Sequence, residues 1–198
     1  METIEKPMNE QESLQLIHEM INVAQKRFSN DSFRFLLWGW IATTAFILGY
    51  VWCIIGKPQY IGYTWAILGT VGGIVSGFYG RKETKTKTVV TYADEYLKYT
   101  WIAYMVSYFI VLGALISLQR FDLINPMCLV LIGISTFITG GLLKFKPLIY
   151  GGVIFWIGAC ISFAIRTEFQ FLISGLTAAC GYLIPGYLLK ARNKNENI

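Results

Sequence analysis

The sequence predicts an all-α, polytopic membrane protein with six transmembrane helices. Of its residues, 55% are hydrophobic and only 15% are charged, whereas soluble domains have about 25% charged residues. The charged residues are gathered into short polar segments, and the apolar windows between them are about 20 residues long. About 20 residues of α-helix cross a hydrocarbon core of about 30 Å. We therefore expect each window to span a bilayer.

Polar or turn-forming residues separate the expected spans. The spans cover residues 33–55, 60–80, 99–118, 123–143, 148–165 and 169–189, between an N-terminal arm at 1–32 and a tail at 190–198. Short connections such as Gly56-Lys57-Pro58 favour antiparallel neighbours, so the spans should form three antiparallel hairpins. Pro185 with Gly186 is expected to kink or loosen the end of span six, because proline lacks the helical donor.

The basic residues predict the orientation. Fourteen of the 17 Lys and Arg residues lie in or beside the arm, where Arg34 is counted, in residues 81–98, in the turn at 144–146 and in the tail. Only Lys57, Arg120 and Arg166 lie in the alternate turns. Because Lys and Arg beside a span stay on the cytoplasmic side, we expect both termini in the cytoplasm. Residues 1–32 show no signal-peptide pattern, so we expect the first span to direct insertion.

Composition also limits the partners and cofactors that we expect. The net charge of +5 arises from residues beside the spans, where topology and anionic lipid explain it, so we expect a lipid bilayer and no nucleic acid as partner. The four cysteines lie singly in apolar segments, and the only histidine is His18 in the arm. A metal site needs clustered ligands. We therefore expect no metal and no other cofactor.

The sequence of the N-terminal arm predicts one amphipathic helix. This helix should begin after a cap at Asn9 and end at a break at Ser29-Asn30-Asp31-Ser32. This helix is expected to lie on the membrane surface, to pack on the cytoplasmic ends of the spans, or to dock a partner. Its acidic start disfavours adhesion to anionic lipid, so we prefer packing against protein. The apolar residues at helical spacing, and hence the candidate partner-binding residues, are Leu14, Ile17, Ile21 and Phe28, with Ala24 between them.

Glycines mark the returning span of each hairpin. Gly69, Gly73 and Gly77 follow one another at four-residue spacing in span two, so they share a helix face and predict a helix-packing seam. Spans four and six are also rich in glycine. Either the hairpin is repeated three times, or this is the ordinary glycine enrichment of packed membrane helices, which we prefer.

The spans carry little chemistry. From Phe35 to Ile55 in span one, and in each of the other spans, there is no Asp, Glu, Lys, Arg or His. This absence disfavours proton-coupled and ion-coupled transport. Their Ser and Thr residues either line a path for a neutral solute or bond to backbone and neighbouring helices, and we prefer the second interpretation. HExxH, GxSxG and Walker motifs are missing, so we do not expect an enzyme. Asp94 and Glu95 form a candidate cytoplasmic polar cluster with His18, or are simply a solvated helix entry.

Two stretches resemble known membrane proteins. Residues 12–21, ESLQLIHEMI, followed by residues 33–40, FRFLLWGW, resemble a set of uncharacterised bacterial membrane proteins that place a cytoplasmic helix before several spans. The glycine-punctuated hairpins, as in residues 65–69, WAILG, look like those of small six-span proteins of the acid-resistance membrane protein type. These resemblances imply a multi-pass protein of the bacterial cytoplasmic (inner) membrane.

The hypothesis that we prefer is a non-enzymatic interaction, regulatory or scaffold protein that acts through its cytoplasmic face. A protein partner or a homo-oligomer would form there. The alternative is a channel or facilitator for a small neutral solute, lined by Ser and Thr and gated near Pro185. A lipid-modifying enzyme that uses Asp94 or Glu95 is a third hypothesis.

Overall fold

The chain is helical throughout the part that its computed structural model describes, which is residues 10–86 and 92–195, with side chains at 32–81 and 95–191. Six helices in it are long and apolar enough to cross a membrane, at Ser32–Ile54, Tyr60–Arg81, Glu95–Ser117, Phe121–Leu142, Lys146–Ala164 and Thr167–Ala191. The predicted all-α, six-span architecture is therefore confirmed. The protein is a multi-pass membrane protein in contact with a lipid bilayer.

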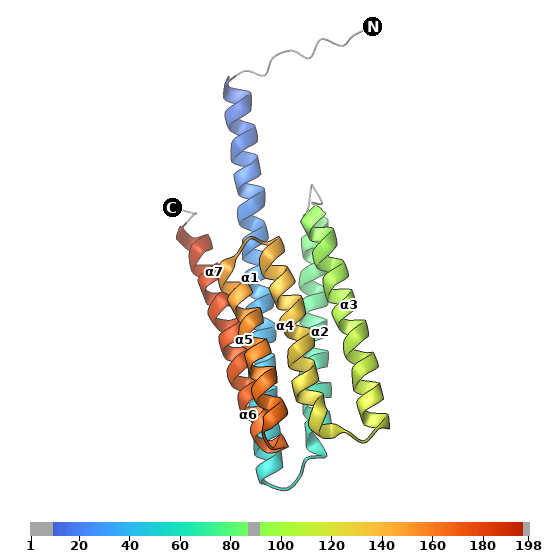
Figure 1. Ribbon diagram of the computed structural model, residues 1–198. Helices are drawn as coiled ribbons and strands as arrows, with labels where there is room; N and C mark the ends of the chain where they lie inside the picture. The colour runs from blue at the N-terminus through green and yellow to red at the C-terminus, as the bar shows by residue number, and fades with distance from the viewer. Residues whose placement is uncertain (1–9, 87–91, 196–198) are drawn as a thin grey trace.

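The elements follow the predicted order, with span six divided. They are α1 (Glu10–Ile54), α2 (Tyr60–Thr86), α3 (Tyr92–Ser117), a 3₁₀ turn η1 (Phe121–Leu123), α4 (Ile124–Leu142), α5 (Lys146–Ala164), α6 (Thr167–Ala178), a π-helical turn η2 (Ala179–Leu183) and α7 (Ile184–Asn195). Consecutive spans run antiparallel and pack as the pairs α1 with α2, α3 with α4, and α5 with α6 (Figure 1). This is the predicted set of three hairpins.

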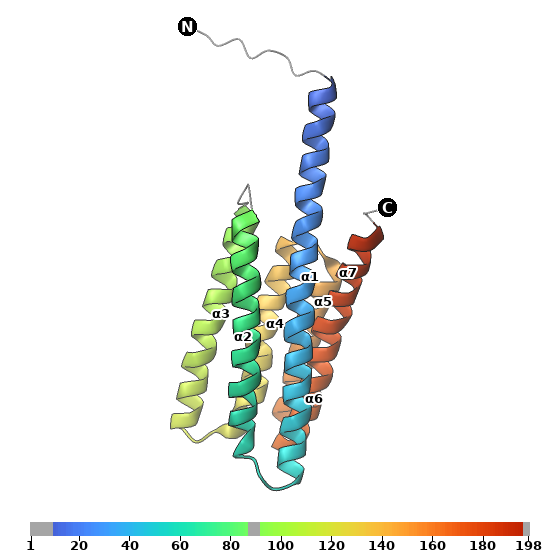
Figure 2. The same ribbon diagram turned by 180° about the vertical axis from the view of Figure 1, so that it is seen from behind.

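The first and third pairs are joined by α1 packing on span six, and the second and third pairs by α4 packing on α5. α1 packs on α6 and α7, and α5 packs on both α4 and α6, whereas α2 packs mainly on α1 and α3 mainly on α4. α2 and α3 therefore lie at the edges of the arrangement. We call the end of the bundle where α7 finishes and the start of α1 projects the arm end, and the opposite end the far end (Figures 1 and 2).

The buried core follows the same contacts. Phe35 and Phe46 of α1 meet Phe155 of α5 and Tyr182 of η2 in one cluster of buried side chains. Towards the arm end, the cluster continues through residues of the α4–α5 turn, the first turn of α5 and α7, which are Leu143, Phe145, Leu148 and Leu189. The core therefore lies between α1, α4, α5 and span six.

α1 differs from the expectation in one respect, because it is a single unbroken helix from Glu10 to Ile54. The predicted break at Ser29-Asn30-Asp31-Ser32 is wrong. Each of these residues costs up to about 0.7 kcal/mol relative to alanine in a helix, whereas glycine and proline cost more. Residues 10–38 contain neither glycine nor proline. A helix already formed by the adjacent span therefore continues through them, since propagation costs less than nucleation.

The indole N–H groups of α1 tie the helix to its neighbours. Trp38 Nε1 donates to Ser76 Oγ at 3.1 Å, and Trp52 Nε1 donates to Thr64 Oγ1 at 3.1 Å, both on α2. Trp40 Nε1 donates to the hydroxyl of Tyr187 on α7 at 3.3 Å. These three indoles of α1 thus each have a hydroxyl partner, as a polar group within a membrane requires.

Span six is loosened before Pro185, as predicted. The π-helical turn η2 occupies Ala179–Leu183, and the N–H of Ile184 donates to the carbonyl of Ala179, five residues back. Pro185 cannot donate to the carbonyl of Gly181, which an α-helix would require. That carbonyl oxygen faces α5, where a Cβ added to Gly151 would lie 2.5 Å from it. The local widening therefore coincides with a close approach of two backbones.

Glycines also bring α4 and α5 together. A Cβ on Gly133 would lie 3.1 Å from the carbonyl oxygen of Gly152, and a Cβ on Gly152 would lie 2.9 Å from that of Gly133. Nearer the arm end, a Cβ on Gly140 would lie 2.6 Å from the backbone nitrogen of Ile149. The two helices thus pack backbone against backbone, which small residues permit in membrane proteins.

Three connections end their helices in the same way. The N–H groups of Lys57, Arg120 and Phe145 each donate at 2.9 Å to a carbonyl five residues back. The residue before each donor has a positive φ, namely Gly56 at 75°, Gln119 at 56° and Lys144 at 50°. This is the Schellman arrangement, in which glycine is favoured because side chains strain the left-handed conformation. The same geometry thus makes turns at both ends of the bundle.

We predict that replacing Gly140 and Gly141 by alanine has opposite effects. Gly140→Ala should lower the free energy of unfolding by about 1–3 kcal/mol, because its Cβ overlaps the backbone of α5. Gly141 has no atom within 4 Å of an added Cβ, so Gly141→Ala should leave stability unchanged or raise it by up to about 1 kcal/mol. Thermal unfolding in detergent, followed by circular dichroism, measures both. Equal effects of the two substitutions would contradict this account of α4–α5 packing.

Candidate functional site

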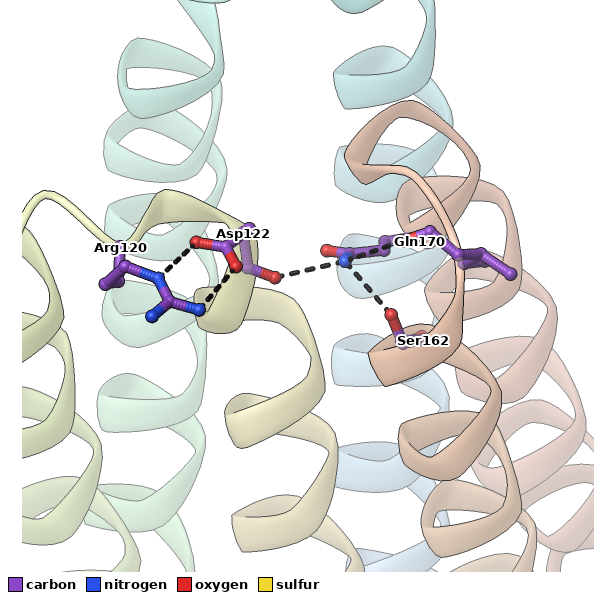
Figure 3. A network of polar contacts seen from close by, with 5 residues as sticks. Arg120, Asp122, Ser162 and Gln170 are labelled. Atoms are coloured by element: carbon purple, nitrogen blue, oxygen red, sulfur yellow. Dashed lines mark hydrogen bonds and ion pairs between the residues drawn. The ribbon is translucent and has the colours of Figure 1, made fainter.

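The far end contains a buried polar network centred on Gln170, in the first turns of α6. Its side chain is 3% exposed. The amide nitrogen donates to the carbonyl oxygens of Asp122 at 3.0 Å, Ser162 at 3.0 Å and Ile165 at 3.3 Å (Figure 3). The last carbonyls of a helix have no partner within the helix. Gln170 therefore satisfies the end of α5 and joins it to the α3–α4 connection.

Two ion pairs lie at the surface beside this network. Arg120 Nε and Nη2 donate to the two carboxylate oxygens of Asp122, each at 3.0 Å. This hydrogen bonding with Asp122 raises the pKa of Arg120. Arg166 pairs with Glu168 at 3.0 Å across the α5–α6 turn. Exposed pairs stabilise a fold little, so their main effect is to neutralise two of the three basic residues predicted for this end.

Most described Ser and Thr hydroxyls in the spans bond to backbone or to a neighbouring helix. Thr70, Ser135, Thr139 and Thr177 donate to carbonyls three or four residues back in the chain. The hydroxyl of Thr136 bonds to that of Tyr182 at 3.3 Å, linking α4 to η2. For these residues the preferred interpretation of the sequence is confirmed, and packing is sufficient to explain them.

Four buried polar atoms have no partner among the described residues. They are Thr43 Oγ1, Ser162 Oγ, Gln170 Oε1 and Ser174 Oγ. Gln170 and Ser174 lie one turn apart on α6, while Ser162 and Thr43 belong to the helices that pack on it. An unpaired buried hydroxyl or amide oxygen costs about 1–3 kcal/mol. Chemically these atoms offer neutral hydrogen bonds alone, and in the described part of the chain no three His, Cys, Asp or Glu side chains converge on a metal position.

The predicted glycine seam has no partner within the described chain. Added Cβ atoms at Gly69, Gly73 and Gly77 would meet nothing within 4 Å, whereas Gly72 of the same helix would meet Ile41 at 2.6 Å. α2 thus uses another side to contact α1, and the packing role of the three glycines stays a prediction. Gly133 and Gly140 of α4, and Gly181 and Gly186 of span six, are closely packed instead. Glycines of the three hairpins therefore occupy different environments, which favours ordinary enrichment over a repeat.

The other predicted site residues lie at the arm end. Leu14, Ile17, Ile21 and Phe28 belong to the projecting part of α1, and their side chains lie outside the described residues, as does that of His18. Asp94 belongs to the first turn of α3 and its side chain is likewise not described. Glu95 is exposed. The grouping of Asp94, Glu95 and His18 therefore stays a prediction.

Gln170 is the residue that the sequence analysis missed. Its signal in the sequence is one amide side chain between Phe169 and Phe171, inside an apolar window. Charged residues and hydroxyls were the polar groups considered within the spans, and side-chain amides were not. A buried amide in a span needs partners as much as a hydroxyl does. That rule would have selected Gln170, although not the three carbonyls that it contacts.

Comparisons of the chain with protein-family models, with curated proteins and with solved structures found no match. The six long apolar helices indicate a multi-span membrane protein, and no family is identified.

We predict that Gln170→Leu lowers the free energy of unfolding by about 1–3 kcal/mol, because three carbonyls lose their shared donor in a buried place. Glu168→Gln is the matched control, two residues away. It removes one exposed ion pair and should change stability by less than about 1 kcal/mol. Thermal unfolding in detergent tests both variants. A Gln170→Leu protein as stable as the parent would show that the network does not hold the far end together.

Proposed function

We propose that this protein is a non-enzymatic interaction protein of the bacterial inner membrane, which regulates or organises another protein through its cytoplasmic face. The observation that carries the proposal is the unbroken helix α1. Its first part rises beyond the ends of the other helices (Figures 1 and 2). An amphipathic helix that projects from the bundle offers an apolar stripe to a partner. It can bind in a hydrophobic groove of the partner or pair with a helix of the partner.

Attachment to a span makes this arm a prepared binding element. The 22 residues from Glu10 to Asp31 extend about 33 Å at 1.5 Å per residue. Nucleation of an isolated helix in water is unfavourable. Here the span provides the nucleus and fixes the direction of the arm. A partner therefore meets a helix whose ordering cost is already reduced, which strengthens binding.

Charge supports a cytoplasmic arm end. At the far end, Arg120 and Arg166 are paired with acidic residues two positions later. At the arm end, the described lysines Lys98, Lys144, Lys146 and Lys190 are exposed. The arm end is thus the more basic in uncompensated charge as well as in residue number, and the positive-inside rule retains such an end in the cytoplasm.

A channel or facilitator for a small neutral solute is the second candidate. One observation favours it: four unpaired polar atoms lie on α6 and the helices packed against it, next to a π-helical turn. Turns of this kind are frequent at functional sites. Glycerol or urea flux in proteoliposomes tests this alternative. The absence of flux for both solutes would count against it.

The interaction proposal predicts that two aspartates on the apolar side of the arm remove the bound partner. The double variant Ile17→Asp and Ile21→Asp should release it, because charge does not enter an apolar contact. Gln15→Asp with Asn22→Asp adds the same charge to the polar side and should retain the partner. Native mass spectrometry after mild detergent extraction reports the composition of the complex. Circular dichroism of both variants checks that the arm stays helical.

If the partner and the oligomer size were the same in the parent and in both double variants, the arm would not be the docking element. A bound lipid or small molecule that persists in all three would instead direct attention to the bundle.

A further inference from the structure

We propose that the arm holds its apolar side over the arm end of its own bundle, and that it receives there an amphipathic helix of a different protein with an acidic membrane-proximal end. This inference rests on the proposed interaction function. It adds the side of the arm that is used, the class of partner and the part of the bundle that the partner touches.

Helical register relates the arm to the span that follows it. Eighteen residues make five full turns of 3.6 residues, so positions 18 apart in an unbroken helix lie on the same face of that helix. The apolar arm positions 14, 17, 21, 24 and 28 therefore correspond to five positions in the span. These are Ser32, Phe35, Gly39, Ala42 and Phe46.

These five positions of the span face the bundle. Ser32, Phe35, Gly39 and Phe46 are buried, and Ala42 is partly buried against the same core. Phe35 meets the ring of Tyr182, with centroids 5.9 Å apart, and a Cβ on Gly39 would lie 2.7 Å from Leu183. By contrast, position 22 of the polar side corresponds to Trp40, which is 54% exposed. The apolar positions of the arm thus continue the bundle-facing side of α1.

This direction rules out straight pairing with a second copy. Two parallel arms that met along these positions would bring their spans together along the same side. That side of the span is occupied by span six of its own chain, as the contacts of Gly39 with Leu183 and of Gly186 with Leu36 show. The second α1 would overlap these helices. The occupant must therefore end at the arm end of the bundle, as a helix of a separate cytoplasmic protein does.

Charge complementarity describes the occupant further. Lys144 and Lys146 flank buried Phe145, and Lys190 follows buried Leu189, so all three lysines lie at the edge of one core cluster. The outer part of the arm instead carries acidic residues, at Glu10, Glu12 and Glu19. A helix laid along the arm with its end over these lysines is favoured when that end carries carboxylates.

The test uses two synthetic helical peptides as probes and the full chain in phosphatidylcholine nanodiscs. Both peptides are 21 residues long with leucine at heptad a and d positions and glutamine elsewhere. One carries three glutamates in its last turn, and the other carries three lysines there. Fluorescence anisotropy gives the Kd of each. We expect the glutamate peptide to bind on the order of tenfold more tightly than the lysine peptide at low salt.

Variants locate the contact. Changing Lys144, Lys146 and Lys190 to glutamine should weaken the glutamate peptide on the order of tenfold and leave the lysine peptide no weaker than before. Lys57→Gln, at the far end, is the control and should change neither. Ile17→Asp with Ile21→Asp should abolish binding of the glutamate peptide, whereas Gln15→Asp with Asn22→Asp should not.

Equal binding of the two peptides, or no binding of either, would overturn the inference. So would a dimer of the chain in nanodiscs that the Ile17 and Ile21 variant dissociates, because the occupant would then be a second copy. These outcomes are distinguishable from failure of the proposed function. A native complex lost on changing Ile17 and Ile21, yet indifferent to the three lysines, would leave the docking function standing and refute this partner class.

Discussion

Close approach of helix backbones at glycine positions is the constraint on which the rest of this structure depends. Within a bilayer, helices gain little from hydrophobic burial against one another, so van der Waals contact between closely fitted surfaces must hold them together. The α4–α5 contact depends on Gly133, Gly140 and Gly152, and α1 reaches span six through Gly39, where a side chain would overlap Leu183. Aromatic residues then fill the space between these seams, as Phe155 and Tyr182 do.

Span six shows how far this constraint extends. Pro185 removes one backbone donor, the helix widens at Ala179–Leu183, and the carbonyl of Gly181 lies against Gly151. A regular α-helix at this position would move both α6 and α7 relative to α1 and α5. The π-helical turn thus sets the relative rotation of the two halves of the span. Each half can then match a different part of α1, with Phe171 against Gly49 and Gly186 against Leu36.

The spans were predictable because charge segregation and helix length leave few alternatives within a bilayer. The continuity of α1 was not, since Ser29 to Ser32 resemble a cap when read locally, and only the neighbouring span makes continuation cheaper than termination. The glycine pattern identified a helix face without its partner: Gly72 contacts α1 while Gly69, Gly73 and Gly77 do not meet another helix in the described chain. Two contacts of Gln170 lie at the end of the preceding helix, but the third, with Asp122, lies 48 residues away, so no local pattern contains the whole network.

Polar and charged residues have different roles in the spans, which hold the fold together, and at the arm end, where we propose that a partner is recognised. The spans contain charged residues only near their ends, and their described hydroxyls mostly bond within the chain, so the interior serves mainly for helix packing. The far end is neutralised by pairs such as Arg120 with Asp122. Among the described regions, only the arm end has both exposed lysines without an acidic partner and apolar helix positions that extend beyond the bundle. α1 is both the helix that joins α2 to span six and the one that extends beyond the bundle. Under the proposed function, a partner that binds the arm more tightly in one packing of α1 against span six than in another would shift the balance between the two packings.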